Sequence, residues 1–217
     1  MDTKILRDMS YGVYVVSTMD GMRPTGCIAN SAMQITSSPA TIAVSINHNN
    51  YTNECIKKCK HFAVSILSEK SDAGIIGTFG FSSGKDTNKF EKTAYDFASG
   101  LPYVSDSCGY MTCMVKDIVE TSTHTIFIGE IEDAAKLSDN PPMTYAYYHN
   151  VIKGKSPKNA PTYDASQEAV SPSADNTTLN KFVCSVCGYV YETEDEVLPD
   201  DFVCPICKMP KDKFVKE

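Results

Sequence analysis

Four cysteines near the C-terminal end of the chain have the spacing of a metal site. They form two Cys-x-x-Cys pairs, Cys184 with Cys187 and Cys204 with Cys207, and sixteen residues separate the pairs. A two-residue gap lets both sulfur atoms of a tight turn reach one ion, and two such turns complete a tetrahedral set of thiolates. This donor set suits zinc or iron, and the spacing does not choose between them.

The segment that carries these cysteines is too short to fold on an apolar core alone. Residues 181–217 are only 37 residues long, and domains of this size usually need a metal or disulfides. The chain has nine cysteines in total and no apolar segment behind a basic N-terminal flank. We therefore expect no secretory signal and reduced thiols, and we expect metal binding to drive the folding of the tail.

Charge and hydropathy exclude several classes of protein. The net charge is −7 and the isoelectric point is about 5.1, which argues against a nucleic-acid or anionic-membrane partner. Apolar runs are strand-sized and do not approach the ~18 residues of a membrane helix. These features predict a soluble, cytoplasmic protein.

A change of composition divides the chain. Residues 156–180 hold three prolines, many small polar residues and almost no apolar periodicity. We predict a large domain over 1–163, a flexible linker over 164–180 and a small metal domain over 181–217. By sequence, residues 1–155 have a net charge of −2, the connecting segment −2 and the tail −3.

The large domain lacks the common nucleotide-binding motifs. It contains neither Gly-x-Gly-x-x-Gly nor Gly-x-x-x-x-Gly-Lys-Ser/Thr. Two polar segments, residues 24–39 and 45–52, instead offer hydroxyls, amides and turn N–H groups. On composition alone they read more readily as polar strand ends and turns than as a cofactor site.

The elements that must position these segments are mostly strands. We predict strands over residues 12–18, 41–47, 62–67, 110–120 and 125–137, with a hairpin turn at Asp20-Gly21. In residues 110–120, alternation places Met111, Cys113, Val115 and Val119 on one face. Short helices are predicted over residues 2–9, from a cap at Thr52 to Lys60, and from a cap at Asp72 to Ile76. Many antiparallel strands with few helices indicate a mainly β fold, a closed or partly closed barrel.

The tail resembles rubredoxin. The match covers residues 181–214, including Phe182-Val183 before the first cysteine pair, Leu198-Pro199-Asp200-Asp201 before the second, and Lys213-Phe214. The resemblance implies a one-electron iron centre, with a structural zinc ribbon as the alternative. Two features depart from it: the gap between the pairs is shorter, and Lys208 stands where a glycine usually tolerates positive φ.

The large domain resembles the flavin reductase family over about residues 5–163. The similarity is carried, in order, by Ala29-Asn30-Ser31, Ser37-Ser38-Pro39, Ser45-Ile46-Asn47, Tyr51-Thr52, residues 61–67, residues 79–90 and Tyr147-Tyr148-His149. The family implies an FMN-binding split β-barrel with a few short helices. It also implies a homodimer with the flavin near the interface.

Carried over by position, the resemblance implies a set of FMN-binding residues. Near the isoalloxazine edge and ribityl chain we expect Ala29, Asn30 and Ser31; near the ribityl and phosphate, Ser45, Ile46 and Asn47; and by the phosphate, Tyr51 and Thr52. Family members often have a basic residue near positions 47–48 and two prolines at 39–40, whereas this chain has Asn47-His48 and Pro39-Ala40. No general base is assigned, because the cofactor carries hydride transfer; Phe81, Lys85 and His149 are candidates for shaping the nicotinamide face or the dimer edge.

A flavin barrel joined to a rubredoxin resembles the high-molecular-weight rubredoxins of anaerobic bacteria. The resemblance implies electron flow from NAD(P)H through FMN to iron, and then to an acceptor such as a flavodiiron protein that reduces oxygen or nitric oxide. Two alternatives stay open. One is a flavin reductase with a structural zinc tail, and the other is a non-enzymatic redox sensor.

Overall fold

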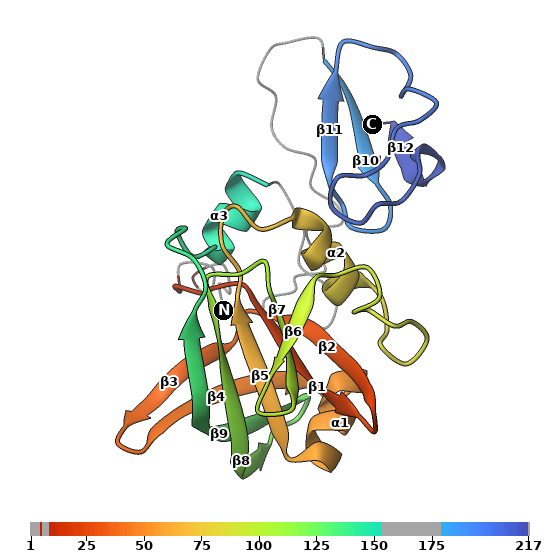
Figure 1. Ribbon diagram of the computed structural model, residues 1–217. Coiled ribbons are helices and arrows are strands. Elements are labelled where there is room, and N and C mark those ends of the chain that lie inside the picture. Colours follow the sequence, from red (N-terminus) through yellow and green to blue (C-terminus); the bar gives the residue numbers. More distant parts are fainter. Residues whose placement is uncertain (1–4, 6–8, 153–178, 217) are drawn as a thin grey trace.

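The computed structural model describes residues 5, 9–152 and 179–216 (Figure 1). Seven strands form one antiparallel sheet in the order β2-β1-β5-β8-β9-β4-β3. Their bounds are β1 (Tyr14–Asp20), β2 (Arg23–Ala29), β3 (Ala32–Ser37), β4 (Ala40–Asn47), β5 (His61–Ile66), β8 (Gly109–Glu120) and β9 (His124–Lys136). A separate hairpin is formed by β6 (Tyr95–Ala98) and β7 (Leu101–Val104).

The sheet curls into a barrel, because strands from its two ends share one buried cluster. Cys27 of β2 and Val44 of β4 lie in this cluster together with Phe62 of β5 and Phe127 of β9. Ile56 of α1 (Tyr51–Cys59) is fully buried in the same cluster. The fold is therefore the mainly β split barrel that the sequence predicted.

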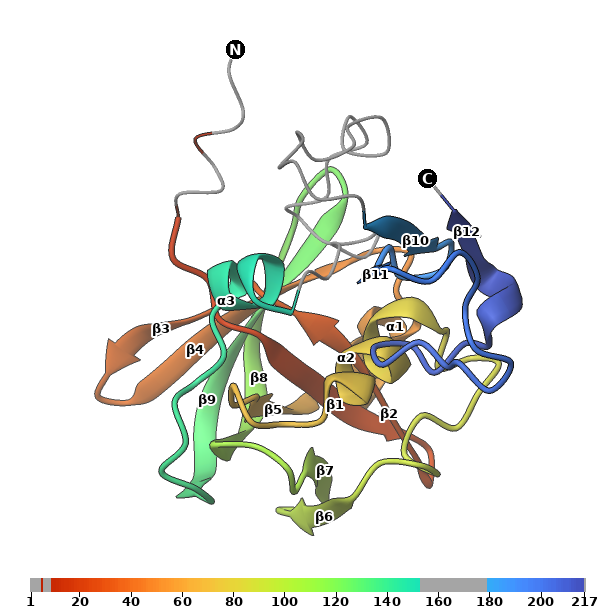
Figure 2. The same cartoon turned by 90° about the horizontal axis from the view of Figure 1, so that it is seen from above.

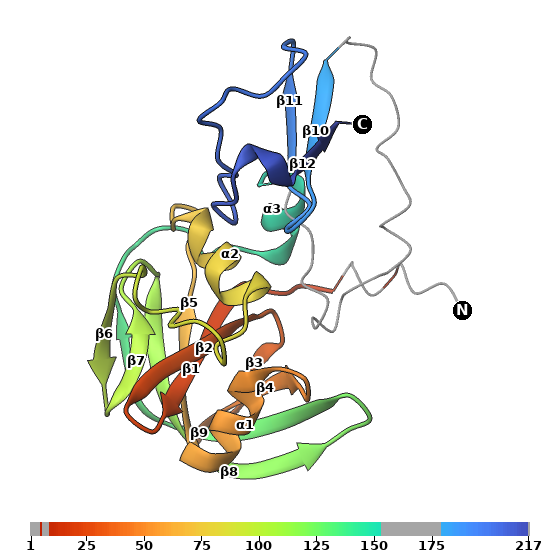
Figure 3. The same ribbon diagram turned by 90° about the vertical axis from the view of Figure 1, so that its right-hand side faces the viewer.

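A second buried cluster lies on the other face of β1 and β5. Val15 belongs to it while its neighbour Val16 belongs to the first cluster, as alternation along a strand requires. Ile76 of α2 (Ala73–Phe81) and Tyr148 of α3 (Tyr145–Asn150) pack here. The cluster thus fixes α2 and α3 on one side of the barrel (Figure 3).

The tail has its own small sheet. Its strands β10 (Asn180–Cys184), β11 (Val190–Thr193) and β12 (Phe214–Lys216) pair in the order β11-β10-β12, and a 3-10 turn, η3 (Lys211–Lys213), precedes β12. The views from the front and from above place the tail beside α2 and α3 (Figures 1 and 2). Within the described residues, no helix is both long and apolar enough to cross a membrane.

Several predicted elements are confirmed, and some details differ. The five predicted strands are present as β1, β4, β5, β8 and β9, and Asp20 pairs with Arg23 across a turn in which Gly21 has φ +61. Asp72 caps α2, which continues beyond the predicted end to Phe81. The cap of α1 is Asn50, whose side chain accepts a hydrogen bond from the backbone N–H of Thr52, so the predicted cap at Thr52 is wrong. The predicted helix over residues 2–9 lies mostly outside the described residues.

The alternation that was predicted for β8 is found over only part of the strand. Cys113 is fully buried, but Val119 is 43% exposed. The pairing of β8 with β9 shifts register between Thr112 and Cys113 and again between Val115 and Asp117. The first irregularity places an extra residue, Glu132, in β9, whereas the second places an extra residue, Lys116, in β8. The second changes which face the following residues of β8 occupy, so a simple alternation does not extend to Val119.

Candidate metal centre and neighbouring polar residues

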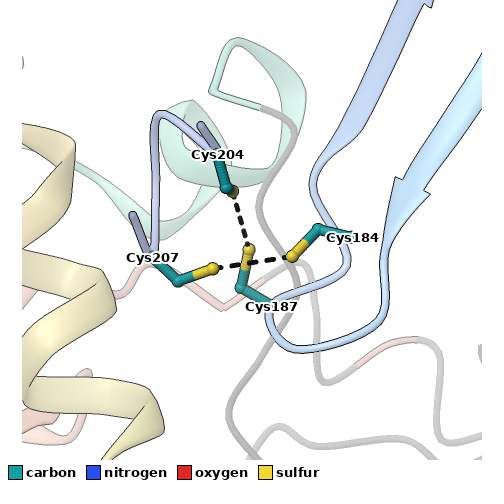
Figure 4. A group of neighbouring side chains, drawn as sticks. All are labelled: Cys184, Cys187, Cys204 and Cys207. Carbon is teal, nitrogen blue, oxygen red and sulfur yellow. Dashed lines mark hydrogen bonds between the residues drawn. The ribbon is translucent and has the colours of Figure 1, made fainter. Parts of the chain in front are cut away.

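The four cysteines of the tail converge on one point (Figure 4). The Sγ atoms of Cys184 and Cys207 lie 3.5 Å apart, as do those of Cys187 and Cys204. All four ligand atoms lie within 4.8 Å of one another. A tetrahedral ion with metal–sulfur bonds of about 2.3 Å would need sulfur–sulfur edges of roughly 3.8 Å, so the four thiols fit one such ion.

Two similar turns hold the cysteine pairs. The N–H of Gly188 donates to the carbonyl of Cys184 at 2.8 Å, and the N–H of Lys208 donates to that of Cys204 at 2.9 Å. The residue after each pair has a left-handed conformation, with φ +71 at Gly188 and +57 at Lys208. Lys208 therefore adopts the positive φ that glycine tolerates more easily.

Electrostatics at the site favour a thiolate. A hydrogen bond from the Cys187 thiol lowers the pKa of Cys204 to about 5, against the effect of burial and with help from the backbone N–H groups of Cys207 and Ile206. The same hydrogen bond raises the pKa of Cys187, which keeps its proton. Because metal binding needs deprotonated sulfur, a site that already favours one thiolate is suited to a cation.

The metal centre is buried partly by the barrel. Cys184, Cys187 and Cys204 are at most 1% exposed, and they form a cluster with Ile206, which is 2% exposed. Three residues outside the tail pack against this cluster: Ala73 and Phe81 of α2, and Ile152. Phe81, a candidate for shaping the nicotinamide face, thus lies against the metal cluster.

The structure brings together two of the segments predicted to bind FMN. The hydroxyl of Ser31 donates to the carbonyl of Ser45 at 2.8 Å, and the N–H of Ser45 donates to the carbonyl of Ser31 at 3.1 Å. Ala29 ends β2 and Asn30 follows it just before this contact, and both are buried. Ser31 and Ser45 are half-buried, so the junction of β2, β3 and β4 presents polar groups that a ligand can reach.

Two further predicted FMN residues have buried side chains. Ile46 is 2% exposed and packs in the barrel core. Thr52 is 1% exposed, and its N–H already donates to Asn50. Neither side chain faces an accessible site, and the carbonyl of Ile46 already accepts a hydrogen bond from the side chain of Asn53 at 2.8 Å.

The residues around the start of α1 are half-buried or exposed but already have local partners. Asn47 accepts a hydrogen bond from the N–H of Asn49, and His48 lies 2.9 Å from Glu120. Tyr51 donates to Asp20 at 2.6 Å, and this hydrogen bond raises the pKa of Tyr51 to about 12. A ligand phosphate here would have to share these groups.

A basic residue that the sequence analysis did not single out lies beside Tyr51. The guanidinium of Arg23 lies 6.0 Å from the centre of the Tyr51 ring and is 2.9 Å from Asp20. Nearby, the hydroxyl of Thr25 is buried and has no hydrogen-bond partner among the described residues, and a Cβ on Gly84 would lie 2.3 Å from it. Arg23 thus places a positive charge near the predicted phosphate end.

The remaining candidates lie in different places. Lys85 is exposed in the loop after α2. His149 lies in the last turn of α3, where its ring stands edge-on to Tyr145 with 4.3 Å between centroids. In the same loop as Lys85, Lys89 is buried and donates to the carbonyls of Gly26 and Phe79.

Comparisons with known proteins match two separate parts of the chain. A family model described as "Flavin reductase like domain" matches residues 6–155, and one described as "Rubrerythrin, rubredoxin-like domain" matches residues 182–215. The chain is 41% identical over 231 aligned residues to the high molecular weight rubredoxin of Moorella thermoacetica, covering 99% of both chains. It is 36% identical to a ferric-chelate reductase (NAD(P)H) of Archaeoglobus fulgidus, covering 75% of this chain and 98% of that protein.

Solved structures resemble the barrel. The flavin reductase PheA2 is 28% identical, with a TM-score of 0.56 over 66% of this chain and 93% of that chain. The NADH:FAD oxidoreductase of Streptomyces globisporus is 22% identical, with a TM-score of 0.61 over 65% of this chain and 84% of that chain, and shares the fold. This chain therefore belongs to the flavin reductase family, and its barrel is followed by a rubredoxin-like domain as in the high molecular weight rubredoxins.

Proposed function

We propose that this chain is an oxidoreductase that passes electrons from NAD(P)H through a bound FMN to iron in the four-cysteine site. The observation that carries the proposal is that this site packs directly against α2 of a flavin reductase-like barrel. A redox centre that exchanges electrons with a barrel-bound flavin must come close to the barrel. A zinc ion that only stabilises the tail has no such requirement.

The four thiols would hold the iron, and the barrel would hold the flavin. The half-buried groups of Ser31, Ser45, Asn47 and Tyr51 are suited to a ribityl chain and phosphate, and Arg23 offers a nearby positive charge. Bound FMN would supply the ability to take up two electrons as one hydride and to give them up singly. The protein's part is to position the flavin and to limit the access of water.

The external acceptor follows from the resemblance to high molecular weight rubredoxins. We propose a flavodiiron-type protein in this role and a homodimer through the barrel. The name of the archaeal relative contains NAD(P)H, which supports a nicotinamide donor without choosing between NADH and NADPH.

The test is an anaerobic visible spectrum of the purified protein before and after stoichiometric NADH, repeated with NADPH. We expect overlapping flavin and ferric-thiolate bands that are both bleached by at least one of the two nucleotides. A variant truncated after Tyr163 should keep the flavin band and lose only the iron band.

Two outcomes would contradict the proposal. Flavin without iron absorbance, in protein produced with iron available, would instead support a flavin reductase with a structural zinc tail. Iron and flavin bands that neither nucleotide bleaches would support a redox sensor that is not an enzyme.

A further inference from the structure

Lys208 occupies a position at which a lysine is unfavourable. Its φ of +57 lies in the left-handed region, and the equivalent residue after the first cysteine pair is Gly188. For a residue with a Cβ this conformation costs roughly a factor of ten in the local equilibrium. A glycine would avoid that cost, so the lysine side chain should serve a purpose outside the turn.

The side chain of Lys208 reaches the barrel. Its Nζ lies 3.6 Å from a carboxylate oxygen of Asp72, the residue that caps α2. A Cβ on Gly74 would lie 2.8 Å from the Cε of Lys208, so the glycine leaves room for the lysine stem. Both partners of the ion pair are more than half exposed, which makes it weak in stability terms but suitable for orientation.

Gly77 brings the same helix into contact with the metal loop. A Cβ at this position would lie 2.2 Å from the carbonyl oxygen of Ile206 and 2.7 Å from the Cα of Cys207. Any side chain at position 77 would therefore push the loop away. Gly74 and Gly77 are three residues apart and share one helix face, although glycine is a poor helix former.

The overall charges make such a local contact useful. By sequence, the tail has a net charge of −3 and residues 1–155 a net charge of −2, so the two parts repel each other at long range. Lys208 places a positive charge at the edge of the metal loop, opposite Asp72. Here the complementary charge fixes the register of the two surfaces.

We propose that Lys208, Gly74 and Gly77 are positioning residues of a reversible docking site, at which the metal loop of the tail sits on α2. Each of the three is unfavourable for its own element, and together they allow one close approach between the two parts. Resting on the proposed function, docking here is the step that brings the iron within reach of electrons from the barrel. Ile206 is covered in the docked state and becomes accessible to an external acceptor after release.

The first test removes the Lys208 side chain and measures amide hydrogen exchange in α2. In Lys208→Gly we expect the amide hydrogens of α2 to exchange at least threefold faster, while chelators remove the metal from the tail a few-fold more slowly because the turn is relaxed. Reduction of iron by the nicotinamide should slow, and reduction of flavin should not change. Lys211→Glu is the control, because Lys211 pairs with Asp200 inside the tail.

The second test changes a residue of α2 and measures how readily Lys208 is cross-linked to Asp72. A zero-length carbodiimide cross-link between Lys208 and Asp72, located by mass spectrometry, should form in the unchanged protein and fall at least fivefold in Gly77→Leu. If leucine impairs folding, Gly77→Ala can replace it. This variant already introduces the clashing Cβ and should also lower the yield of the cross-link. The exchanged pair Lys208→Glu with Asp72→Lys should restore the carbodiimide cross-link that Lys208→Glu alone removes; the cross-link is the readout here because Asp72→Lys also removes the cap of α2.

Unchanged α2 exchange in Lys208→Gly, or an unchanged cross-link in both Gly77 variants, would overturn the docking site. Hydrogen exchange and cross-linking can also be measured on zinc-loaded protein. If no electron reaches the metal and these structural measurements still respond as expected, the proposed electron transfer fails and the docking site stands.

Discussion

Lys89 connects two parts of the barrel through its charged end. The side chain is 4% exposed, and its Nζ donates to the carbonyls of Gly26 in β2 and Phe79 in α2 at 2.9 and 3.0 Å. Burial lowers the pKa of this ammonium group. A buried charge persists when it makes good hydrogen bonds, so Lys89 fixes α2 against β2.

Replacement of this residue should destabilise the barrel. In Lys89→Met the aliphatic stem is roughly conserved, but two carbonyls lose their donor, which should lower the free energy of unfolding by about 1–3 kcal/mol. Urea unfolding followed by circular dichroism measures the change. Lys92→Met is the matched control, because Lys92 is exposed in the same loop, and its effect should be close to zero.

The effect of Lys89→Met should also depend on pH. Between the lowered folded pKa and the ordinary value of 10.5, the unfolded chain binds more protons than the folded one, so the unchanged protein gains stability as pH rises through this window. Methionine does not titrate. The difference in unfolding free energy between the two proteins should therefore widen from neutral pH to about pH 10, and a constant difference would contradict the effect of burial.

The metal ligands give a second prediction at the scale of single residues. Cys204→Ser should abolish the ferric-thiolate absorbance and unfold the tail, because the cysteines themselves form most of its buried cluster. Flavin binding by the barrel should not change. Cys59→Ser, which alters a half-buried thiol in α1, should leave both bands intact, and a tail that stays folded without metal would contradict the prediction.

The metal site was predictable from the sequence because its chemistry is local. Two cysteines separated by two residues can share one ion in almost any context. The contacts of Lys89 with Gly26, of Arg23 with Tyr51 and of Gly77 with the metal loop were not predictable, because each joins residues that only the folded chain brings together. His48 illustrates the same limit, since its partner Glu120 is 72 residues away.

At the scale of elements, strands with clear alternation were predicted within about two residues. The strands β2 and β3 were instead interpreted as polar ends and turns, because β2 contains Pro24 and the two strands together contain three hydroxyl residues. In the structure, β2 and β3 are the two edges of the sheet, where prolines and polar residues are tolerated. Sheet order, which decides what is an edge, cannot be derived from local pattern.

The edge strand β3 exposes two apolar side chains. Met33 is 68% exposed, and Ile35, the extra residue of a bulge against β4, is 45% exposed. Exposed apolar residues on an edge strand favour association with another chain. We therefore place β3 in the proposed homodimer interface.

This placement predicts that charge on β3 weakens the dimer. The double variant Met33→Glu with Ile35→Glu should shift the molar mass, measured by light scattering after size exclusion, from dimer toward monomer. Met22→Glu provides the control, because Met22 is 96% exposed in the turn between β1 and β2. A double variant with the mass of the unchanged protein would exclude β3 from the interface.

At the scale of the whole molecule, the covalent connection between barrel and tail decides how electrons can reach the metal. A tethered partner faces its site at an effective concentration on the order of millimolar, far above typical protein concentrations. Docking on α2 can therefore rely on weak contacts such as the ion pair of Asp72 with Lys208. Weak contacts also allow the tail to leave again.

Because the barrel and the tail are covalently connected, we expect the rate constant for reduction of the iron to be independent of protein concentration. After rapid anaerobic mixing with excess nicotinamide, the rate constant for bleaching of the ferric-thiolate band should stay the same when the protein is diluted about a hundredfold, because each tail is loaded within its own chain or dimer. A rate constant that falls in proportion to protein concentration would show transfer between separate molecules. In the docking variant Gly77→Leu, the intramolecular step should slow, so a concentration-dependent component should become visible at high protein concentration. The same dilution series thus separates a tail that is loaded on its own barrel from one that exchanges electrons only by collision.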